Sequence, residues 1–174
     1  MGQKIHPIGF RVGIIRGWES RWFEVKKFGE YLKEDNKIRK YLRDYLRHAG
    51  ISRIEIERAT KRLHVIVNTG KPGLVIGKRG SGIEELRRRL EKLTSETIKI
   101  SVKEVKRPEL DAHLVGQNIA EALEKRVAFR RAMKQAVGRS MKAGAQGVKV
   151  QLSGRLGGNE IARSERLERV IHHA

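Results

Sequence analysis

Cysteine is absent from this chain of 174 residues, and so are long apolar runs. The lack of cysteine excludes disulfide bonds, thiol catalysis and cysteine-ligated zinc, and it is compatible with a reducing compartment. No apolar stretch approaches the roughly 18 residues that a membrane-spanning helix needs. The N-terminus also lacks the apolar core of a signal peptide. We therefore expect a soluble, cytoplasmic protein without a membrane partner.

Acidic residues are scarce relative to basic ones. The chain has 20 Asp and Glu against 39 Lys and Arg, which gives a formal net charge of +19. Each of five consecutive segments that together cover the chain is net positive. One basic patch is typical of a protein that touches nucleic acid with a single face, so positive charge throughout favours nucleic acid on several sides. An ordinary soluble basic protein is the alternative, and a charge of this size disfavours it.

Aromatic residues are also few, and all except Phe129 lie between residues 10 and 45. In the first part of the chain they are mixed with glycine and basic residues, without helical or strand periodicity. We interpret residues 1–35 as a basic, aromatic arm with apolar anchors. We expect most of its aromatic residues, Trp18 and Trp22 included, to pack on the protein.

Residues 36–106 switch between helical and strand periodicity and predict a compact α+β domain. Gly50 follows the first helix as a stop signal, and Glu84 stands at capping-box spacing from Ser81, where a later helix begins. The predicted elements are a helix over residues 36–49, a hairpin with strands near 54–57 and 63–68 and a turn at 59–62, a helix from residue 81, and a strand over 98–105. The apolar stripe of the helix from residue 81 comprises Ile83, Leu86, Leu90 and Leu93.

Residues 107–174 predict a second α+β domain, with two helices followed by a strand. The helical pattern over residues 110–143 breaks near residues 127–128, and a strand follows at 148–152. Phe129, Met133 and Val137 form the buried stripe of the second helix. Basic residues between them then lie on the exposed arc, where they suit phosphate contact without sequence preference. An ordinary solvated helix face is an equally good interpretation of that arc.

A glycine-rich stretch, Gly70-Lys-Pro-Gly-Leu-Val-Ile-Gly-Lys-Arg-Gly80, lies between a predicted strand and a predicted helix. A nucleotide-binding P-loop has four residues before its Gly-Lys-Ser/Thr, whereas Gly73 and Gly77 enclose three. Arg79 also stands where the magnesium-binding hydroxyl belongs. A Gly-x-x-Gly turn fits instead, because glycine lets a sugar-phosphate backbone approach and Lys78 and Arg79 supply charge. We expect Ile76 and Ile83 to hold this turn on the core.

The element order helix, strand, strand, helix, helix, strand, with Val75-Ile-Gly-Lys-Arg-Gly80 near its centre, resembles a type II KH domain. Three further stretches are similar to the bacterial family of ribosomal protein number three of the small subunit. They are Met1-Gly-Gln-Lys-Ile-His-Pro-Ile-Gly-Phe-Arg-Val-Gly13, Arg130-Arg-Ala-Met-Lys-Gln-Ala-Val137 and Val150-Gln-Leu-Ser-Gly-Arg-Leu-Gly-Gly158. The resemblance runs from residue 1 to about residue 165.

This resemblance implies a structural constituent of the small-subunit head that binds ribosomal RNA and contacts messenger RNA at the entry channel, beside other head proteins. It implies no catalytic residue, cofactor, metal or small-molecule substrate. At the matching positions, the residues implied to bind RNA at the KH loop are Gly77, Lys78, Arg79, Gly80, Arg87 and Arg88. Those implied to face incoming messenger RNA are Arg130, Arg131 and Lys134. Those implied to bind ribosomal RNA are Lys4, His6, Arg11, Arg16, Arg155 and Arg163.

Two departures limit the resemblance. Residues 53–105 contain no aromatic side chain, so the KH domain has no stacking platform, and weak, sequence-tolerant contact with RNA is expected. In the family the chain continues for several dozen residues after the stretch that matches 162–165, through further strands. Here it ends at residue 174, so we expect a truncated second domain in which the strand at 148–152 has no partner.

Two other functions compete with the ribosomal one. A free KH-type RNA-binding regulator would use the same domain away from the ribosome, although the basic arm and the spread of charge disfavour it. A nuclease or strand-cleaving lyase would need clustered carboxylates, whereas the acidic residues here are scattered among basic ones.

Overall fold

The structure is a computed structural model that describes residues 3–59, 62–94 and 96–170. The chain divides into two compact units, Met1–Glu104 and Val105–Ala174. Each unit has its own apolar core. No helix in the described parts of the chain is long and apolar enough to cross a membrane.

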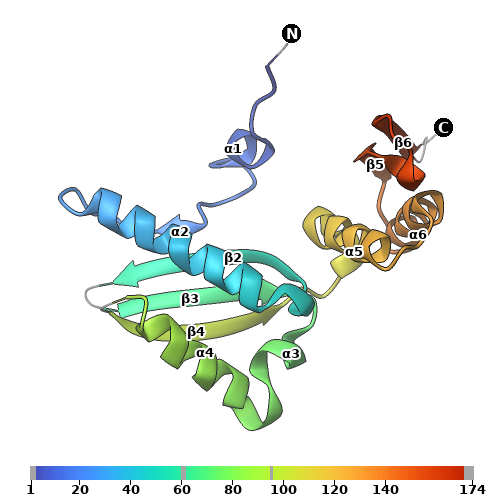
Figure 1. The fold of residues 1–174 in the computed structure, drawn as a ribbon. Coiled ribbons are helices and arrows are strands. Elements are labelled where there is room, and N and C mark those ends of the chain that lie inside the picture. The colour runs from blue at the N-terminus through green and yellow to red at the C-terminus, as the bar shows by residue number, and fades with distance from the viewer. Residues whose placement is uncertain (1–2, 60–61, 95, 171–174) are drawn as a thin grey trace. The chain divides into compact units, whose positions relative to one another are not determined.

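The first unit is built on a four-stranded sheet with the strand order β1-β2-β3-β4 (Figure 1). β1 runs parallel to β2, β2 and β3 form an antiparallel hairpin, and β4 runs parallel to β3. Residues 60 and 61 of the expected turn lie outside the described residues. The elements are α1 (Pro7–Arg11), β1 (Ser20–Arg21), α2 (Phe28–Tyr45), β2 (Ile51–Ala59), β3 (Arg62–Thr69), α3 (Pro72–Ile76), α4 (Ser81–Glu91) and β4 (Thr97–Glu104).

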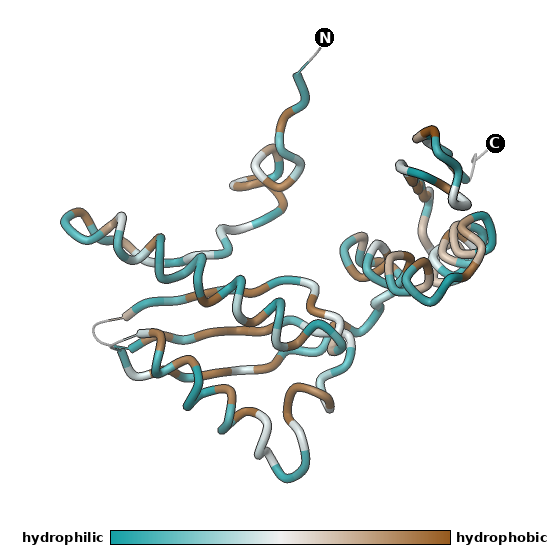
Figure 2. The backbone as a smooth tube through the Cα atoms, in the orientation of Figure 1, coloured by the Kyte–Doolittle hydropathy of each residue, from teal (hydrophilic) through white to brown (hydrophobic). Residues whose placement is uncertain are grey.

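One face of this sheet carries the core. Hydrophobic residues recur along β2, β3 and β4 (Figure 2), and their alternation places every second side chain on the face that α2 and α4 cover. Ile54 lies opposite Val67 and Ile56 opposite Val65 in the hairpin register. The buried cluster comprises Ile38, Leu42, Leu46, Ala49, Ile51, Ile54, Ile56, Leu63, Val65, Val67, Val75, Leu86, Leu90 and Ile98. The order α2-β2-β3-α3-α4-β4 confirms the predicted helix, strand, strand, helix, helix, strand.

The predicted start of the first helix is wrong, because the helix begins earlier in the chain. α2 begins at Phe28 rather than near residue 36, so the end of the expected arm is helical. The pattern is hidden because Phe28 and Leu32 are exposed while a charged residue, Asp35, is completely buried. The remaining part of the segment is also more ordered than an extended arm, since it contains α1 and pairs with the sheet through β1.

The start and end of α4 also differ from expectation. Ser81 is its first helical residue, as predicted, but Gly80 occupies the cap and no side chain caps the helix, so the expected capping box with Glu84 is not formed. The helix ends at Glu91, so Leu93 lies beyond it and is 42% exposed rather than part of the buried stripe.

The second unit packs two helices against a two-stranded antiparallel sheet. Its elements are α5 (Ala112–Glu124), α6 (Phe129–Lys142), β5 (Gly147–Gly154) and β6 (Arg163–Val170). The helical break near residues 127–128 is confirmed. The expectation of a strand without a partner is wrong, because β6 pairs with β5 along its whole length. β6 was missed because only Leu167 among its residues packs on the core, as is common for a charged edge strand.

Candidate nucleic-acid interface

The glycine loop joins α3 to α4 through an unusual backbone path. Gly77 has φ 70° and ψ −178°, a combination that is open essentially to glycine alone. Arg79 and Gly80 both lie in the left-handed region, with φ 54° and 82°. The Gly77 N–H donates to the Gly73 carbonyl at 3.0 Å, which closes α3 before the turn. These conformations explain glycine at both Gly77 and Gly80.

A third glycine, Gly82, is as constrained as the two that define the motif. A Cβ atom at Gly82 would lie 2.7 Å from the Val75 carbonyl oxygen, and one at Gly77 would lie 2.9 Å from the Gly82 nitrogen. The two short helices therefore touch backbone to backbone at this point. The sequence gives no sign of this constraint, because a Gly-x-x-Gly pattern marks only its own two glycines.

The side chains of the loop leave its charges open to solvent. Lys78 and Arg79 are exposed, and neither forms an ion pair or side-chain hydrogen bond with the residues described. Val75, which is 2% exposed and belongs to the buried cluster, anchors the turn, whereas the expected anchor Ile83 is half-buried and is not among the residues packed on that cluster. The expected anchor Ile76 is 38% exposed and does not serve as one.

On α4, the predicted arginines differ in their partners. Arg87 lies 3.5 Å from Glu91 one turn later, whereas Arg88 is exposed and has no acidic partner within the described ranges. The adjacent Arg89 is engaged differently. Hydrogen bonds to Tyr41 and Glu85 raise the pKa of its guanidinium. Among the residues implied to bind RNA at the KH loop, Lys78, Arg79 and Arg88 are thus the cations that remain available for an outside anion.

The second basic group lies on α6. Ala132, Met133 and Val137 face the core of the second unit, and Phe129 is half-buried beside them. This leaves Arg130, Arg131 and Lys134 exposed over the first two turns. Arg131 and Lys134 form no ion pair within the part of the chain that is described. The expected arrangement of a buried stripe with basic residues between its members is therefore present.

β6 adds a feature to this group that the sequence analysis did not anticipate. Glu165 on β6 lies 3.2 Å from Arg130 and 3.6 Å from Arg163. The hydrogen bond to Glu165 raises the pKa of Arg130. Both guanidinium groups also lie over the Phe129 ring, at 5.7 and 5.8 Å from its centre. One residue implied to face messenger RNA and one implied to bind ribosomal RNA therefore share a carboxylate and an aromatic ring.

The remaining predicted residues lie in or beside α1 and in the segment after β5. His6 caps α1, because its Nδ1 accepts from the backbone N–H groups of Ile8 and Gly9. The Arg11 guanidinium donates to the Pro7 carbonyl, and that of Arg155 donates to the Asn159 carbonyl. Lys4 and Arg16 are exposed near the start of the chain. All of these side chains reach solvent, while His6, Arg11 and Arg155 also stabilise the local backbone.

The aromatic residues of the first segment divide into two kinds. Trp22 packs at 5.4 Å from the Phe28 ring and 5.6 Å from the Tyr31 ring, as expected. Trp18 is 71% exposed, and Phe10 and Phe23 are exposed too, so the expectation that most of these residues pack on the protein is wrong for them.

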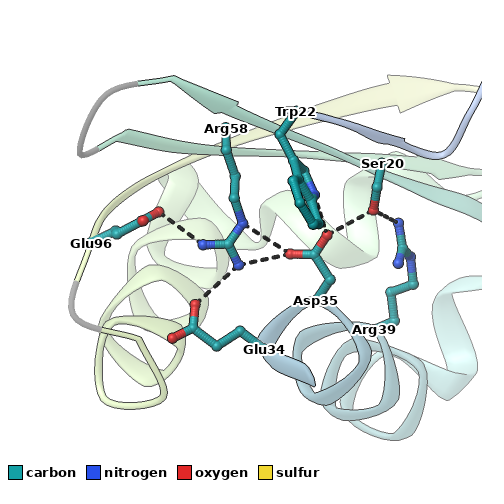
Figure 3. Close-up of polar contacts among 7 residues, drawn as sticks. All are labelled: Ser20, Trp22, Glu34, Asp35, Arg39, Arg58 and Glu96. Atoms are coloured by element: carbon teal, nitrogen blue, oxygen red, sulfur yellow. Dashed lines mark hydrogen bonds and ion pairs between the residues drawn. The ribbon is translucent and has the colours of Figure 1, made fainter. Parts of the chain in front are cut away.

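A buried polar network fixes this segment to the sheet (Figure 3). Asp35 on α2 is 0% exposed, and its carboxylate accepts from Ser20 at 2.7 Å, from the Trp22 indole at 2.8 Å and from Arg58 at 2.7 and 3.1 Å. Arg58 also pairs with Glu34 and Glu96 at 3.1 Å. Burial alone would lower the pKa of Arg58, but its acidic partners, led by Asp35, outweigh burial and raise it.

The acidic and histidine side chains of the described structure do not gather into a metal site. No group of three or more His, Cys, Asp or Glu side chains in residues 3–59, 62–94 and 96–170 could hold a metal ion. A cleft of about 460 Å³ lies within the second unit between α5 and β5 and is lined mainly by apolar side chains such as Val115, Ile119 and Leu152. Unpaired cations on exposed turns suit phosphate contact instead.

Comparison with known proteins finds two family models and several relatives that match this chain. Residues 37–110 match the model of the KH domain, and residues 119–173 match that of the ribosomal protein S3 C-terminal domain. The small ribosomal subunit protein uS3 of Caldicellulosiruptor bescii is 61% identical over 167 residues, which cover 95% of this chain and 75% of that protein. Those of Streptococcus sanguinis and Enterococcus faecalis are 57% and 56% identical over 165 residues, with 95% of this chain and 76% of each relative covered.

Proposed function

Because this chain belongs to the family of small ribosomal subunit protein uS3, we propose that it is a structural constituent of the small ribosomal subunit and binds RNA through its KH domain. It is not an enzyme. In finer detail, the proposal places it in the subunit head, where it binds ribosomal RNA, contacts messenger RNA at the entry channel and adjoins other head proteins. Its surface meets RNA on several sides, in keeping with its net charge of +19.

One observation carries the messenger RNA part of this proposal. Arg131 and Lys134 are exposed on α6 without acidic partners among the described residues, next to Arg130, whose one acidic partner there is Glu165. An unpaired guanidinium or ammonium group gains most by meeting a phosphate, because no internal ion pair has to be broken first. Contacts of this kind are blind to base sequence, as contact with every passing messenger requires.

The KH domain has the complementary task of holding RNA in place. Its glycine turn exposes Lys78 and Arg79 beside a backbone that admits close approach. The absence of aromatic side chains in residues 53–105 favours phosphate contact over base stacking. The basic first segment, with exposed Phe10 and Trp18, supplies a further surface for ribosomal RNA.

Sedimentation on sucrose gradients tests the ribosomal placement. We expect the chain, followed by blotting, to remain with the small subunit at both low and high salt. A free KH regulator would instead be found only in the light fractions, and that result would reject the ribosomal placement for this chain. Uncharging the loop, as Lys78→Ala with Arg79→Ala, is expected to weaken binding to the subunit more at low salt than at high salt, because fewer phosphate contacts make the affinity less dependent on salt.

Photo-crosslinking tests the contact with messenger RNA. Small subunits that carry the chain are loaded with messenger RNA containing 4-thiouridine downstream of the decoding site. The triple variant Arg130→Ala, Arg131→Ala and Lys134→Ala is expected to lose most of the crosslink. The control variant replaces Arg139, Lys142 and Lys149 by alanine, which removes the same charge from exposed positions of the same unit. Equal loss in both variants would mean that Arg130, Arg131 and Lys134 make no specific contact with messenger RNA.

A further inference from the structure

The turn between α5 and α6 contains a residue in an unfavourable backbone conformation. Arg126 has φ 60°, and apart from Arg79 it is the only non-glycine residue with positive φ in the described part of the chain. Eight other positions there with positive φ are all glycine. The left-handed region penalises any side chain with a Cβ atom, least for asparagine and aspartate. Arg79 belongs to the glycine loop of the KH domain, so the same residue type recurs at a second exposed turn.

The turn itself does not need arginine at this position. Its hydrogen bonds are made by the backbone, with the N–H of Arg126 donating to the Leu123 carbonyl at 2.9 Å and that of Val127 to the Ala122 carbonyl at 3.0 Å. The Arg126 side chain is exposed and forms no ion pair or hydrogen bond with any described residue. Lys125 already places a cation at the end of α5, where the helix dipole favours one. Glycine or asparagine would therefore form this turn with less strain.

Nearby positive charges add electrostatic repulsion to the backbone strain at Arg126. Arg130 and Arg131 follow within five residues, in the first turn of α6, and that turn contains no acidic residue. The Cα atoms of Arg126 and Arg130 can be no more than about 14 Å apart. On β6, the carboxylate of Glu165 is already paired with Arg130 and Arg163. Strain and repulsion of this kind persist where a functional contact outweighs them.

We propose that Arg126 is a phosphate-binding residue that extends the basic surface of α6 across the α5–α6 turn. Its ligand is the backbone of a single RNA strand, which then runs along Arg126, Arg130, Arg131 and Lys134. The inference rests on the proposed contact of α6 with messenger RNA, and it adds a residue that no family motif assigned. Because the contact is to phosphate, it is independent of base sequence.

Binding of the purified full chain to a short single-stranded RNA, measured by fluorescence anisotropy at several salt concentrations, tests the inference. Arg126→Asn is expected to lower the slope of log affinity against log salt by about 0.7, which is one phosphate contact, or about fivefold in affinity at 0.1 M salt. Arg126→Lys keeps the charge and should keep the slope. Arg139→Asn removes the same charge from an exposed position in the last turn of α6 and serves as the control.

The melting temperature gives an independent test, because a structural role for Arg126 predicts the opposite change. Asparagine tolerates the left-handed conformation, so Arg126→Asn should raise the melting temperature of the second unit by about 2–4 °C. A lower melting temperature, or an unchanged salt slope, would overturn the inference. The triple variant at Arg130, Arg131 and Lys134 is measured alongside. If it lowers the slope and Arg126→Asn does not, the proposed function stands without this residue; if neither does, the proposed function fails as well.

Discussion

Replacing Asp35 by alanine removes the centre of the polar network that joins the first segment to the sheet. Its carboxylate accepts two hydrogen bonds from Arg58 and one each from Ser20 and Trp22, and it has no access to water. Removing one partner of a buried ion pair costs about 3–5 kcal/mol. Arg58 keeps Glu34 and Glu96, so we expect the lower end of that range, about 3 kcal/mol.

Urea denaturation of the full chain measures this loss. With a slope of about 2 kcal/mol per M, a loss of about 3 kcal/mol moves the midpoint of the first unit down by about 1.5 M. Trp22 reports on the same network, and its signal is isolated by Trp18→Phe at an exposed position. The emission of Trp22 should shift to the red in the alanine variant, because the indole loses its acceptor and gains water.

Two comparison variants test whether the burial and charge of Asp35 cause this loss of stability. Asp44 lies on the same helix, is exposed and has no acidic or basic partner among the described residues, so Asp44→Ala should change stability by less than about 0.5 kcal/mol. Asp35→Asn keeps the shape but turns an amide donor toward groups that are themselves donors, so it should lose nearly as much as alanine. A midpoint for Asp35→Ala within about 0.3 M of the parent chain would show that the network adds little to stability.

Three further changes test the loop, a surface ion pair and the α6 surface. Gly82→Ala should cost about 2 kcal/mol, because its Cβ would lie 2.7 Å from a carbonyl oxygen, whereas Gly73→Ala in open space should be close to neutral; urea denaturation measures both. Glu168 forms a hydrogen bond with Arg166 that holds its pKa below the ordinary 4.5. The stabilising contribution of this pair should therefore be present above pH 4.5 and be lost as pH falls through the lower folded pKa. Carbon NMR titration of the Glu168 carboxyl measures that pKa. Glu165→Gln should tighten binding of single-stranded RNA by about twofold to fivefold at low salt, because it frees the arginines that Glu165 occupies.

Each of these three predictions has an outcome that would contradict it. Equal stabilities of the two alanine variants would mean that the helices of the loop can separate without cost. A carboxyl pKa of 4.5 or more would show that the pair on β6 does not persist in solution. Unchanged or weaker RNA binding by the glutamine variant would mean that the arginines beside position 165 do not meet RNA.

The sequence was sufficient for the KH domain because its core follows simple alternation. Ile54, Ile56, Val65 and Val67 alternate strictly in the hairpin, and all four are buried. The first turns of α2 could not be found in the same way. There the buried position is Asp35, whose carboxylate is satisfied by Ser20 and Trp22 from the first segment and by Arg58 from β2. Sequence periodicity detects apolar burial and is blind to a carboxylate that tertiary partners satisfy.

The candidate site shows a similar division. The glycine turn and the exposed arc of α6 follow from local spacing, so their residues were identified correctly as neighbours. The convergence of Arg130 and Arg163 on Glu165 could not be foreseen, because it depends on the pairing of β5 with β6. β6 has Leu167 as its one residue packed on the core, and no local pattern distinguishes such an edge strand from a loop.

The pairing of β1 with β2 bears on the order in which the chain folds as it is made. Arg21 and Glu57, which are joined by a hydrogen bond, are 36 residues apart, so β1 leaves the ribosome about 2–7 s before its partner at ordinary rates of synthesis. β4 must then emerge before the sheet of the first unit is complete. The second unit lies wholly after that point and contains its own core. The KH surface therefore matures first during translation, and the surface of α6 matures after it.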